Sequence, residues 1–328
     1  MKTRKTWRTT LLASLLAACS LGAAHAQSDA YPSRPVRIIV PYVPGGTVDL
    51  VARVLAQRLT EQMGQPFVVE NRAGASGVIG SDLVAKAPAD GYTIGLGTSS
   101  QMVMNVGLYK TLPFDVERDL RSIGLVARTG MILVASSKMP PTLAGLIAQA
   151  KAQPGKITYG SGGPGSISHI VGEAFAKAAG ISLLHVPYKG NGPALADLAG
   201  GHVDLLFDGF LATNPLVQQG KAHILALSAP QRSAMGPQVP TFAEAGLPDY
   251  QAYTWNNLFA PAATPQPVID RLNRALNQAL AQPGLQQRLA QGGSEALGPS
   301  TPADADSFGQ RERARWVPFV RALNIETA

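Results

Sequence analysis

One pattern occurs twice in this chain and limits the folds that it can adopt. The first copy, residues 37–46, reads RIIVPYVPGG, and the second, residues 183–192, reads LLHVPYKGNG. Each copy is an apolar run that predicts a strand, followed by Val-Pro-Tyr, a glycine-rich turn and a segment with helical spacing. A chain in which strands, turns and helices alternate in this way is expected to form parallel sheets with right-handed crossovers.

The two glycine-rich turns suggest that the protein binds an anion. The first N–H groups of a helix have no partner within the helix and lie at the positive end of its dipole. Gly45 and Gly46 have no Cβ, so a ligand can approach the backbone closely, and Thr47 and Val48 supply the first helical N–H groups. Asp49 is expected to cap or orient the turn, because its carboxylate would repel an anion. A tight structural turn explains one copy equally well, but two copies favour two lobes that hold one small acidic ligand.

The first 26 residues are expected to be a signal peptide that directs export to the periplasm. Four basic residues precede a short apolar core from Leu11 to Ala18, and Ala24-His25-Ala26 offers small residues for cleavage. The run that ends in Ala18-Cys19 also resembles a lipoprotein box, so lipid attachment at Cys19 is the alternative. We favour cleavage after Ala26. The remaining sequence has no apolar run long enough to predict a membrane helix.

Composition and charge narrow the class of protein. A length of 328 residues with 45% apolar content fits one large or two ordinary domains. Without residues 1–26 the chain has 24 basic and 21 acidic residues, a net charge of +3. These charges form no basic stripe, so nucleic acid is not expected as a partner. A monomer is expected.

A dinucleotide site is considered and disfavoured. Residues 160–165 match the Gly-x-Gly-x-x-Gly fingerprint between an expected strand and an expected helix. The fingerprint requires an acidic residue at the end of the next strand, but that strand ends in His185-Val186-Pro187-Tyr188. A turn lined by Ser161 and Ser166 fits a small carboxylate better.

The sequence offers little for catalysis, metal binding or a cofactor. The histidines after the leader are scattered, and nothing matches a His-x-x-x-His metal pattern or a Gly-x-Ser-x-Gly nucleophile motif. His169 is therefore expected to line or support the preceding turn. Asp208 ends an expected strand, where it either reaches the ligand or caps the next helix. Trp255 fits the wall of a cleft or a core position.

Eight short motifs stand in order along the chain: Tyr31-Pro32-Ser33-Arg34-Pro35, Val40-Pro41-Tyr42-Val43-Pro44-Gly45-Gly46 with Asp49, Val69-Glu70-Asn71-Arg72-Ala73-Gly74-Ala75, Ala89-Asp90-Gly91-Tyr92-Thr93, Leu112-Pro113-Phe114-Asp115, Tyr159-Gly160-Ser161-Gly162, His185-Val186-Pro187-Tyr188-Lys189-Gly190 and Pro240-Thr241-Phe242-Ala243-Glu244-Ala245-Gly246. With these motifs the chain resembles the solute-binding receptors of tripartite tricarboxylate transporters, the Bug family. The resemblance covers essentially the whole sequence after the leader.

The resemblance implies an α/β periplasmic binding protein of the two-lobed, Venus-flytrap kind (type II). Each lobe would be a mixed, mostly parallel sheet flanked by helices. Residues 27–128 with 252–328 would form lobe 1, and residues 129–251 would form lobe 2. The long strand-like run at 123–136 and a return strand at 253–260 would cross between the lobes, which suits a hinge.

The family further implies a receptor without catalytic activity. It would capture a small organic carboxylate between the lobes and deliver it to one large and one small membrane permease subunit. Two alternatives stay open: an exported enzyme acting on a carboxylate or nucleotide, and a ligand sensor that feeds a signalling partner. The family often has a neutral or amide residue near Asp208, so the carboxylate found here leaves the far end of the ligand undefined.

The resemblance and the two turns together give a set of expected ligand-binding residues. They lie in the turns and at the strand ends beside them: Tyr42, Gly45, Gly46, Thr47, Val48, Thr98, Ser99, Ser100, Ser161, Gly162, Gly163, Ser166, His169, Pro187, Tyr188, Lys189, Gly190, Gly192, Pro193 and Asp208.

Overall fold

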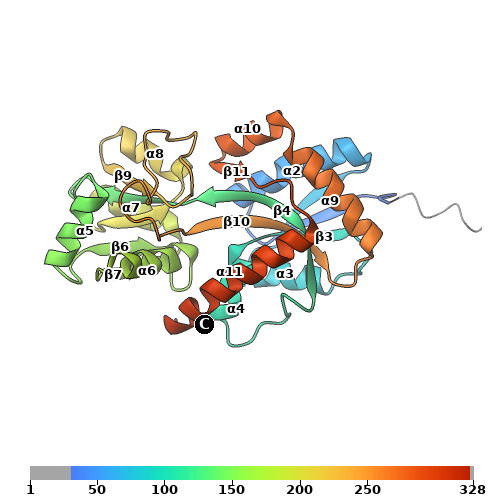
Figure 1. Cartoon of the computed structure of the whole chain (residues 1–328), viewed down its shortest axis with the longest axis horizontal. Coiled ribbons are helices and arrows are strands. Elements are labelled where there is room, and N and C mark those ends of the chain that lie inside the picture. Colours follow the sequence, from blue (N-terminus) through green and yellow to red (C-terminus); the bar gives the residue numbers. More distant parts are fainter. Residues whose placement is uncertain (1–30, 326–328) are drawn as a thin grey trace, which may run out of the picture.

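Two β-sheets flanked by helices lie one after the other along the long axis of the molecule (Figure 1). The computed structural model describes residues 31–325, so the expected signal peptide and Cys19 lie outside the described residues. Within residues 31–325 no helix combines the length and the apolar character needed to cross a membrane. The arrangement confirms the expected fold class of two mixed sheets covered by helices.

The first sheet contains strands from both ends of the described chain. Its six strands follow the order β11 (Ser294–Ala296), β4 (Leu120–Gly130), β10 (Tyr253–Pro261), β3 (Thr93–Thr98), β1 (Val36–Val40) and β2 (Phe67–Asn71). Strands β2, β1 and β3 are parallel, as the alternation of strands and helices predicts. Strand β10 runs antiparallel to both of its neighbours, β3 and β4, and β11 runs antiparallel to β4.

Two separate groups of helices pack on this sheet. One apolar core joins the sheet to α2 (Thr47–Met63), α9 (Gln266–Leu280) and α10 (Pro283–Gln291). The other group consists of η1 (Ala75–Gly77), α3 (Val78–Ala85), η2 (Ser100–Met104), α4 (Asn105–Leu108) and α11 (Pro302–Ala322). A central strand such as β1 is therefore buried along most of its length.

The second sheet has five strands. They follow the order β7 (Leu184–Pro187), β6 (Thr158–Ser161), β8 (Leu205–Asp208), β5 (Ile132–Ser136) and β9 (Ala222–Leu227). Strands β7, β6 and β8 are parallel, and β5 runs antiparallel to β8 and β9. Its helices are α5 (Leu143–Ala152), α6 (Ile167–Ala179), α7 (Asn191–Gly200) and α8 (Phe210–Gln218).

The chain passes between the sheets at two adjacent points. Only Met131 separates β4 of the first sheet from β5 of the second, and the chain returns through Ala252 into β10. Gly130 and Tyr253 are register partners, so the two connections run side by side (Figure 1). The hydroxyl of Ser228 accepts the N–H of Met131 at 2.9 Å and donates to the carbonyl oxygen of Ala252 at 2.6 Å. One buried side chain thus holds both connections together.

The start of α8 differs from the prediction. The sequence predicts a helix from residue 215 to residue 219, because proline favours the first turn of a helix. Helix α8 instead begins at Phe210 and contains Pro215 in its interior.

The end of β3 also differs from the prediction. The sequence predicts a polar turn over residues 97–100, but Gly97 and Thr98 belong to β3, and Ser100 begins η2. The buried side chain of Gln101 explains the difference, because it accepts the N–H of Thr98 at 2.9 Å and so satisfies the end of the strand.

Candidate functional site

The first glycine-rich turn connects β1 to α2 and is fixed from behind by Asp49. The carboxylate of Asp49 accepts the Gly45 N–H at 3.0 Å, Arg53 Nε at 2.8 Å and Asn71 Nδ2 at 2.9 Å. Burial alone would raise the pKa of Asp49, but the bonds from Arg53, Gly45 and Asn71 outweigh it and hold the pKa at about 2. The carboxylate is therefore ionised and orients the turn, as the sequence predicts.

The start of α2 has no side-chain cap. Its N-cap residue is Gly46, and no side chain there accepts a hydrogen bond from the first turn of the helix. Thr47 and Val48 follow Gly46 and are partly exposed. This turn can therefore present backbone N–H groups to an anion.

A polar cluster beside this turn joins β1 to the end of β3. The Tyr42 hydroxyl lies 3.0 Å from Thr98 Oγ1 and accepts a bond from Gln101 Nε2 at 2.9 Å. Ser99 Oγ lies 3.1 Å from Thr254 Oγ1. Thr98 and Ser99 are buried, so their hydroxyls serve contacts within the protein.

The second glycine-rich turn connects β7 to α7. Its N-cap residue is Gly190, whose φ of 107° favours glycine, and no side chain caps the helix. Asn191 and Gly192 are the first helical residues, and Pro193 has no N–H to offer. Pro187, Lys189, Gly192 and Pro193 are exposed. Each of the two repeats therefore forms a strand, a glycine-rich turn and a helix without a side-chain cap, one in each sheet, although Gly46 is extended and Gly190 has a positive φ.

A third turn, between β6 and α6, lies against the second. The Gly190 N–H donates to the Gly162 carbonyl oxygen at 3.2 Å. The Gly162 N–H donates to Ser168 Oγ at 2.9 Å, and this hydroxyl donates to Asn191 Oδ1 at 2.9 Å. The positions of the second and third turns are thus coupled.

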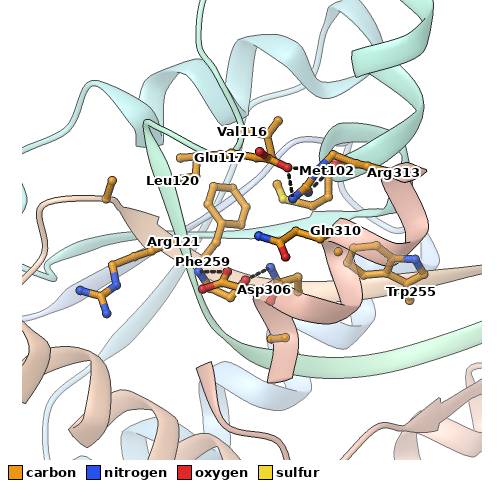
Figure 2. Close-up of a pocket in the computed structure, with 15 residues that line it drawn as sticks. Met102, Val116, Glu117, Leu120, Arg121, Trp255, Phe259, Asp306, Gln310 and Arg313 are labelled. Atoms are coloured by element: carbon orange, nitrogen blue, oxygen red, sulfur yellow. Dashed lines mark hydrogen bonds and ion pairs between the residues drawn. The ribbon is translucent and has the colours of Figure 1, made fainter. Parts of the chain in front are cut away.

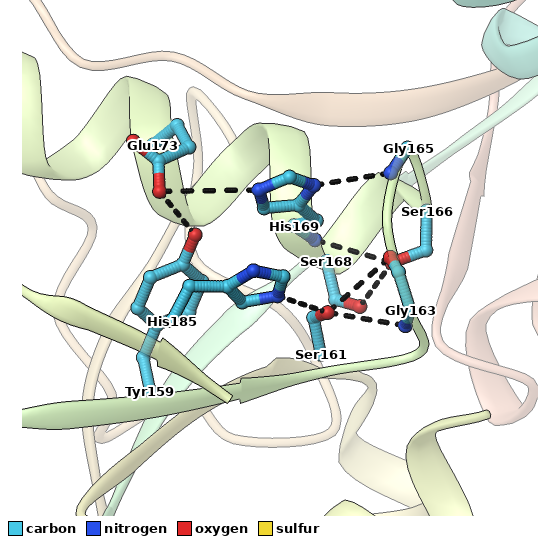
Figure 3. A network of polar contacts seen from close by, with 9 residues as sticks. All are labelled: Tyr159, Ser161, Gly163, Gly165, Ser166, Ser168, His169, Glu173 and His185. Atoms are coloured by element: carbon cyan, nitrogen blue, oxygen red, sulfur yellow. Dashed lines mark hydrogen bonds and ion pairs between the residues drawn. The ribbon is translucent and has the colours of Figure 1, made fainter. Parts of the chain in front are cut away.

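Two stacked imidazole rings lie directly behind the third turn (Figure 3). His169 and His185 have ring centroids 3.9 Å apart and planes only 5° from parallel. His169 Nδ1 accepts the Gly165 N–H at 3.0 Å, and His185 Nε2 lies 2.6 Å from Ser161 Oγ. Burial lowers the pKa of both rings, and the neighbouring His169 helps to lower that of His185 to about 4. His169 is almost fully buried and supports the turn.

Asp208 stands at the end of β8, where α8 begins. Its Oδ1 accepts the N–H of Gly209 at 2.8 Å. Burial raises the pKa of Asp208, while the Gly209 N–H and the Asn191 amide act in the opposite direction. Gly209 is the N-cap of α8, and no side chain caps that helix.

The structure brings the expected residues together in two groups, one at the strand ends of each sheet. The first group includes Tyr42, Thr98 and Ser100, whose N–H donates to Thr98 Oγ1 at 3.1 Å. The second group includes the turns around Gly162 and Gly190. Each group lies where parallel strands of its own sheet end, which is the usual position of a ligand site in an α/β sheet.

One close contact joins the third turn to the other sheet. A Cβ added at Gly165 would lie 2.6 Å from Leu108 Cδ2 of α4. Glycine is therefore the residue that fits here, and the first sheet's helix α4 approaches the second sheet beside the third turn.

Gln101 organises the first group and was not among the expected site residues. It is wholly buried, and it bonds Thr98, Tyr42 and the Ser76 carbonyl oxygen. The one available signal was a lone glutamine before the apolar residues 102–104, because a buried amide must find partners.

Asn191 and His185 organise the second group and were also missed. Asn191 joins Ser168 to the Phe207 carbonyl oxygen, and His185 stacks on His169. Both residues lie within the second repeat, but their roles depend on contacts with segments outside it, which the repeat does not reveal.

Two cavities lie apart from the expected binding residues, because none of those residues lines either of them. One, of about 420 Å³, is lined by residues of both sheets, including Arg128 and Gly130 on one side and Phe210 and Leu227 on the other. The other, of about 310 Å³, lies between α11 and the first sheet (Figure 2). Within residues 31–325, no three His, Cys, Asp or Glu side chains are grouped as a metal site.

The chain is similar in sequence to a family of known proteins. A sequence model described as the tripartite tricarboxylate transporter family receptor matches residues 51–325. Protein BugT of Bordetella pertussis is 39% identical over 302 residues, which are 91% of this chain and 92% of that protein.

Two solved structures extend the similarity to the fold. The R. palustris protein Rpa4515 with adipate is 36% identical, with a TM-score of 0.79 over 90% of this chain and 99% of that chain. The periplasmic binding protein BugD is 34% identical, with a TM-score of 0.75 over 91% of this chain and 100% of that chain.

Proposed function

The chain belongs to the family of tripartite tricarboxylate transporter receptors, and we propose that it captures a small organic dicarboxylate between two lobes in the periplasm. The family consists of transport receptors and not enzymes. The proposed lobes are residues 27–128 with 252–328 and residues 129–251, and the two adjacent connections between the sheets serve as the hinge. The captured ligand is delivered to the large and the small permease subunit, and the protein acts as a monomer.

Two helix starts, those of α2 and α7, carry this proposal, because each follows one copy of the repeated Val-Pro-Tyr turn. Helices α2 and α7 begin with glycine N-caps and no capping side chain. Helices α5, α6 and α11 are capped by Thr142, Ser166 and Thr301, whereas α3, α8, α9 and α10 also begin without a side-chain cap but do not follow the repeated turn. A helix start without a side-chain cap offers N–H groups and a positive dipole end to an external anion. We assign one ligand carboxylate to the two uncapped turns, around Gly46 and Gly190.

The expected residues serve the proposed site in two different ways. We propose that Gly46, Thr47, Val48 and Gly192 contact the carboxylate through their N–H groups, while the N–H groups of Gly45 and Gly190 are bonded to Asp49 and to the Gly162 carbonyl oxygen and hold the two turns. The hydroxyls of Thr98 and Ser161, together with His169, fix the positions of the turns through the bonds described above. Selectivity then depends on side chains rather than on the backbone of the turns, with Asp208 and the exposed Lys189 as candidates.

We propose that the ligand carries a second carboxylate, by analogy with a relative of known structure. The relative Rpa4515 was solved with adipate, a dicarboxylate. In this chain a second carboxylate would extend away from the turns towards the cavity lined by residues of both sheets. Arg128 lines that cavity, where it is paired with Glu295 at 2.8 Å.

A thermal-shift series tests the proposal. The protein without its leader would be heated with succinate, malate, adipate or citrate, and with the matched neutral amides, at pH 7.5. A ligand at about 100 times its Kd adds about 2.7 kcal/mol to the free energy of unfolding, so in a protein of this length a cognate dicarboxylate should raise the Tm by roughly 3–5 °C. Titration calorimetry of each stabilising compound would give its Kd. If the neutral amides raised the Tm and the carboxylates did not, the proposal would be wrong.

A further inference from the structure

We propose that His169, stacked on His185, is a pH-sensitive positioning residue that holds the turn at residues 163–166 in its binding conformation and releases it when protonated. The link to ligand binding rests on the proposed function, because this turn supports the one around Gly190. The outcome is a receptor that binds its ligand at neutral pH and loses it as the pH falls.

The contact between His169 and Gly165 defines the required protonation state. The Gly165 N–H donates to His169 Nδ1 at 3.0 Å, so this nitrogen carries no proton. A neutral ring then has its proton on Nε2, which lies 3.9 Å from Glu173 Oε1. A second proton on Nδ1 would place two donors against each other, and the Gly165 N–H would have to move away (Figure 3).

Gly165 has little freedom to adjust within the turn. It has φ +73°, a conformation that other residues rarely adopt, and the space beside its Cα is filled by Leu108. Ser166, the next residue, caps α6 by accepting the N–H of His169. Movement of Gly165 would therefore disturb both the start of α6 and the contact with α4.

The titratable groups around His169 come from three elements. His185 of β7 stacks on it at 3.9 Å, and Tyr159 of β6 lies 6.5 Å away at an angle of 25°. Glu173 of α6 faces Nε2 and also accepts the Tyr159 hydroxyl. Because two positive rings at this distance would repel each other, the pair takes up one proton far more readily than two.

Protonation has different consequences at the two rings. Burial lowers the pKa of both rings. His185 could keep its contact with Ser161 in either state, because a hydroxyl donates or accepts. His169 has no such choice at Nδ1, so its protonation breaks the Gly165 bond.

Two variants separate the proton switch from simple packing. In His169→Asn the side-chain Oδ1 takes the place of Nδ1 and accepts the Gly165 N–H, but it is not protonated near neutral pH. In His169→Leu no acceptor is left. A matched control is His223→Gln on β9, because His223 contacts the Met139 carbonyl oxygen through Nε2 and an amide nitrogen can replace it.

The first readout is the affinity for adipate, measured by calorimetry from pH 7.5 to pH 4 on the protein without its leader. Below the pKa of His169, the affinity of the native protein should fall by about tenfold more per pH unit than that of His169→Asn. The His169→Asn curve also accounts for protonation of adipate itself. His169→Leu should bind weakly at every pH, and His223→Gln should follow the native curve.

The second readout needs no ligand and keeps the two proposals apart. In a ¹H–¹⁵N titration of the free protein, the Gly165 amide should shift with the same midpoint as the His169 ring, and it should not shift in His169→Asn. If no carboxylate binds, the proposed function fails while this titration still decides the role of His169. A Gly165 amide that ignores His169, or adipate curves that coincide for the native protein and His169→Asn, would overturn the inference.

Discussion

Ser228 and Ala252 are joined by a 2.6 Å hydrogen bond from a side-chain hydroxyl to a backbone carbonyl oxygen. The same hydroxyl accepts the Met131 N–H, and the Ser228 N–H donates back to the Met131 carbonyl oxygen at 2.8 Å. Met131 and Ala252 are the residues through which the chain leaves and re-enters the first sheet. Ser228 therefore determines how the two connections lie relative to each other.

Replacing Ser228 by alanine should destabilise the protein by about 1–3 kcal/mol, because the Met131 N–H and the Ala252 carbonyl oxygen would lose a buried partner. Urea unfolding followed by circular dichroism would measure the loss. Ser182→Ala, at an exposed position, is the control and should change the free energy of unfolding by less than about 0.5 kcal/mol. Equal midpoints for the two variants would contradict the role given to Ser228.

Replacing Asp49 by asparagine should loosen the first turn and reduce stability by about 1–3 kcal/mol at pH 7, since an amide cannot accept all three bonds. The pKa of Asp49 is depressed to about 2, so its contribution is present above its unfolded value and is lost as the pH falls through the folded one. The stability difference between the native protein and Asp49→Asn should therefore shrink between pH 4 and pH 2, roughly the interval between the two pKa values. Urea unfolding at several pH values would measure it; a constant difference would show that the charge does not stabilise the turn.

Replacing Gly46 by valine should abolish ligand binding and leave the fold intact. Gly46 has φ −83° and ψ 173°, which valine adopts readily, and a Cβ there would meet nothing within 4 Å. A branched side chain would instead fill the space where the ligand is proposed to contact the backbone. Calorimetry gives the affinity and thermal unfolding gives the stability, with Gly284→Val in α10 as the control. Full affinity in Gly46→Val would exclude the first turn from the site.

Replacing Asp208 by asparagine should strengthen binding of a plain dicarboxylate several-fold, because a like charge near the second carboxylate is removed. The same change should weaken binding of an amino dicarboxylate whose ammonium group contacts Asp208. Affinities for succinate and aspartate at pH 7.5 would be compared in the native and variant proteins. If neither affinity changed, Asp208 would lie outside the reach of the ligand.

The fold was predictable because its main signals are local. The strand-like runs before Pro41 and Pro187 each lead through a glycine-rich turn into a helix, and both form parallel strands. The turn role of Asp49 followed from charge alone. The position of Trp255 was left open, and the structure buries it against Phe308 in the core.

The buried hydrogen bonds behind the candidate site were not predictable from local sequence patterns. Gln101 and His185 become important only when β1, β3, β6 and β7 assemble and bring them against Tyr42 and Ser161. Hydrogen bonds between residues distant in sequence leave no periodicity in the chain. The start of α8 also differs, because the helix begins at Phe210 and contains Pro215 in its interior, a position in which proline is usually disfavoured.

Gly130 of β4 and Tyr253 of β10 are register partners in the first sheet. The whole second sheet, with its helices, enters and leaves the first sheet through two neighbouring positions of one β-ladder. Joining Gly130 to Tyr253 by a short turn would convert β4 and β10 into an ordinary hairpin and leave the strand order of the first sheet unchanged. In architectural terms, the second sheet with its helices is an insertion in the loop of a β-hairpin.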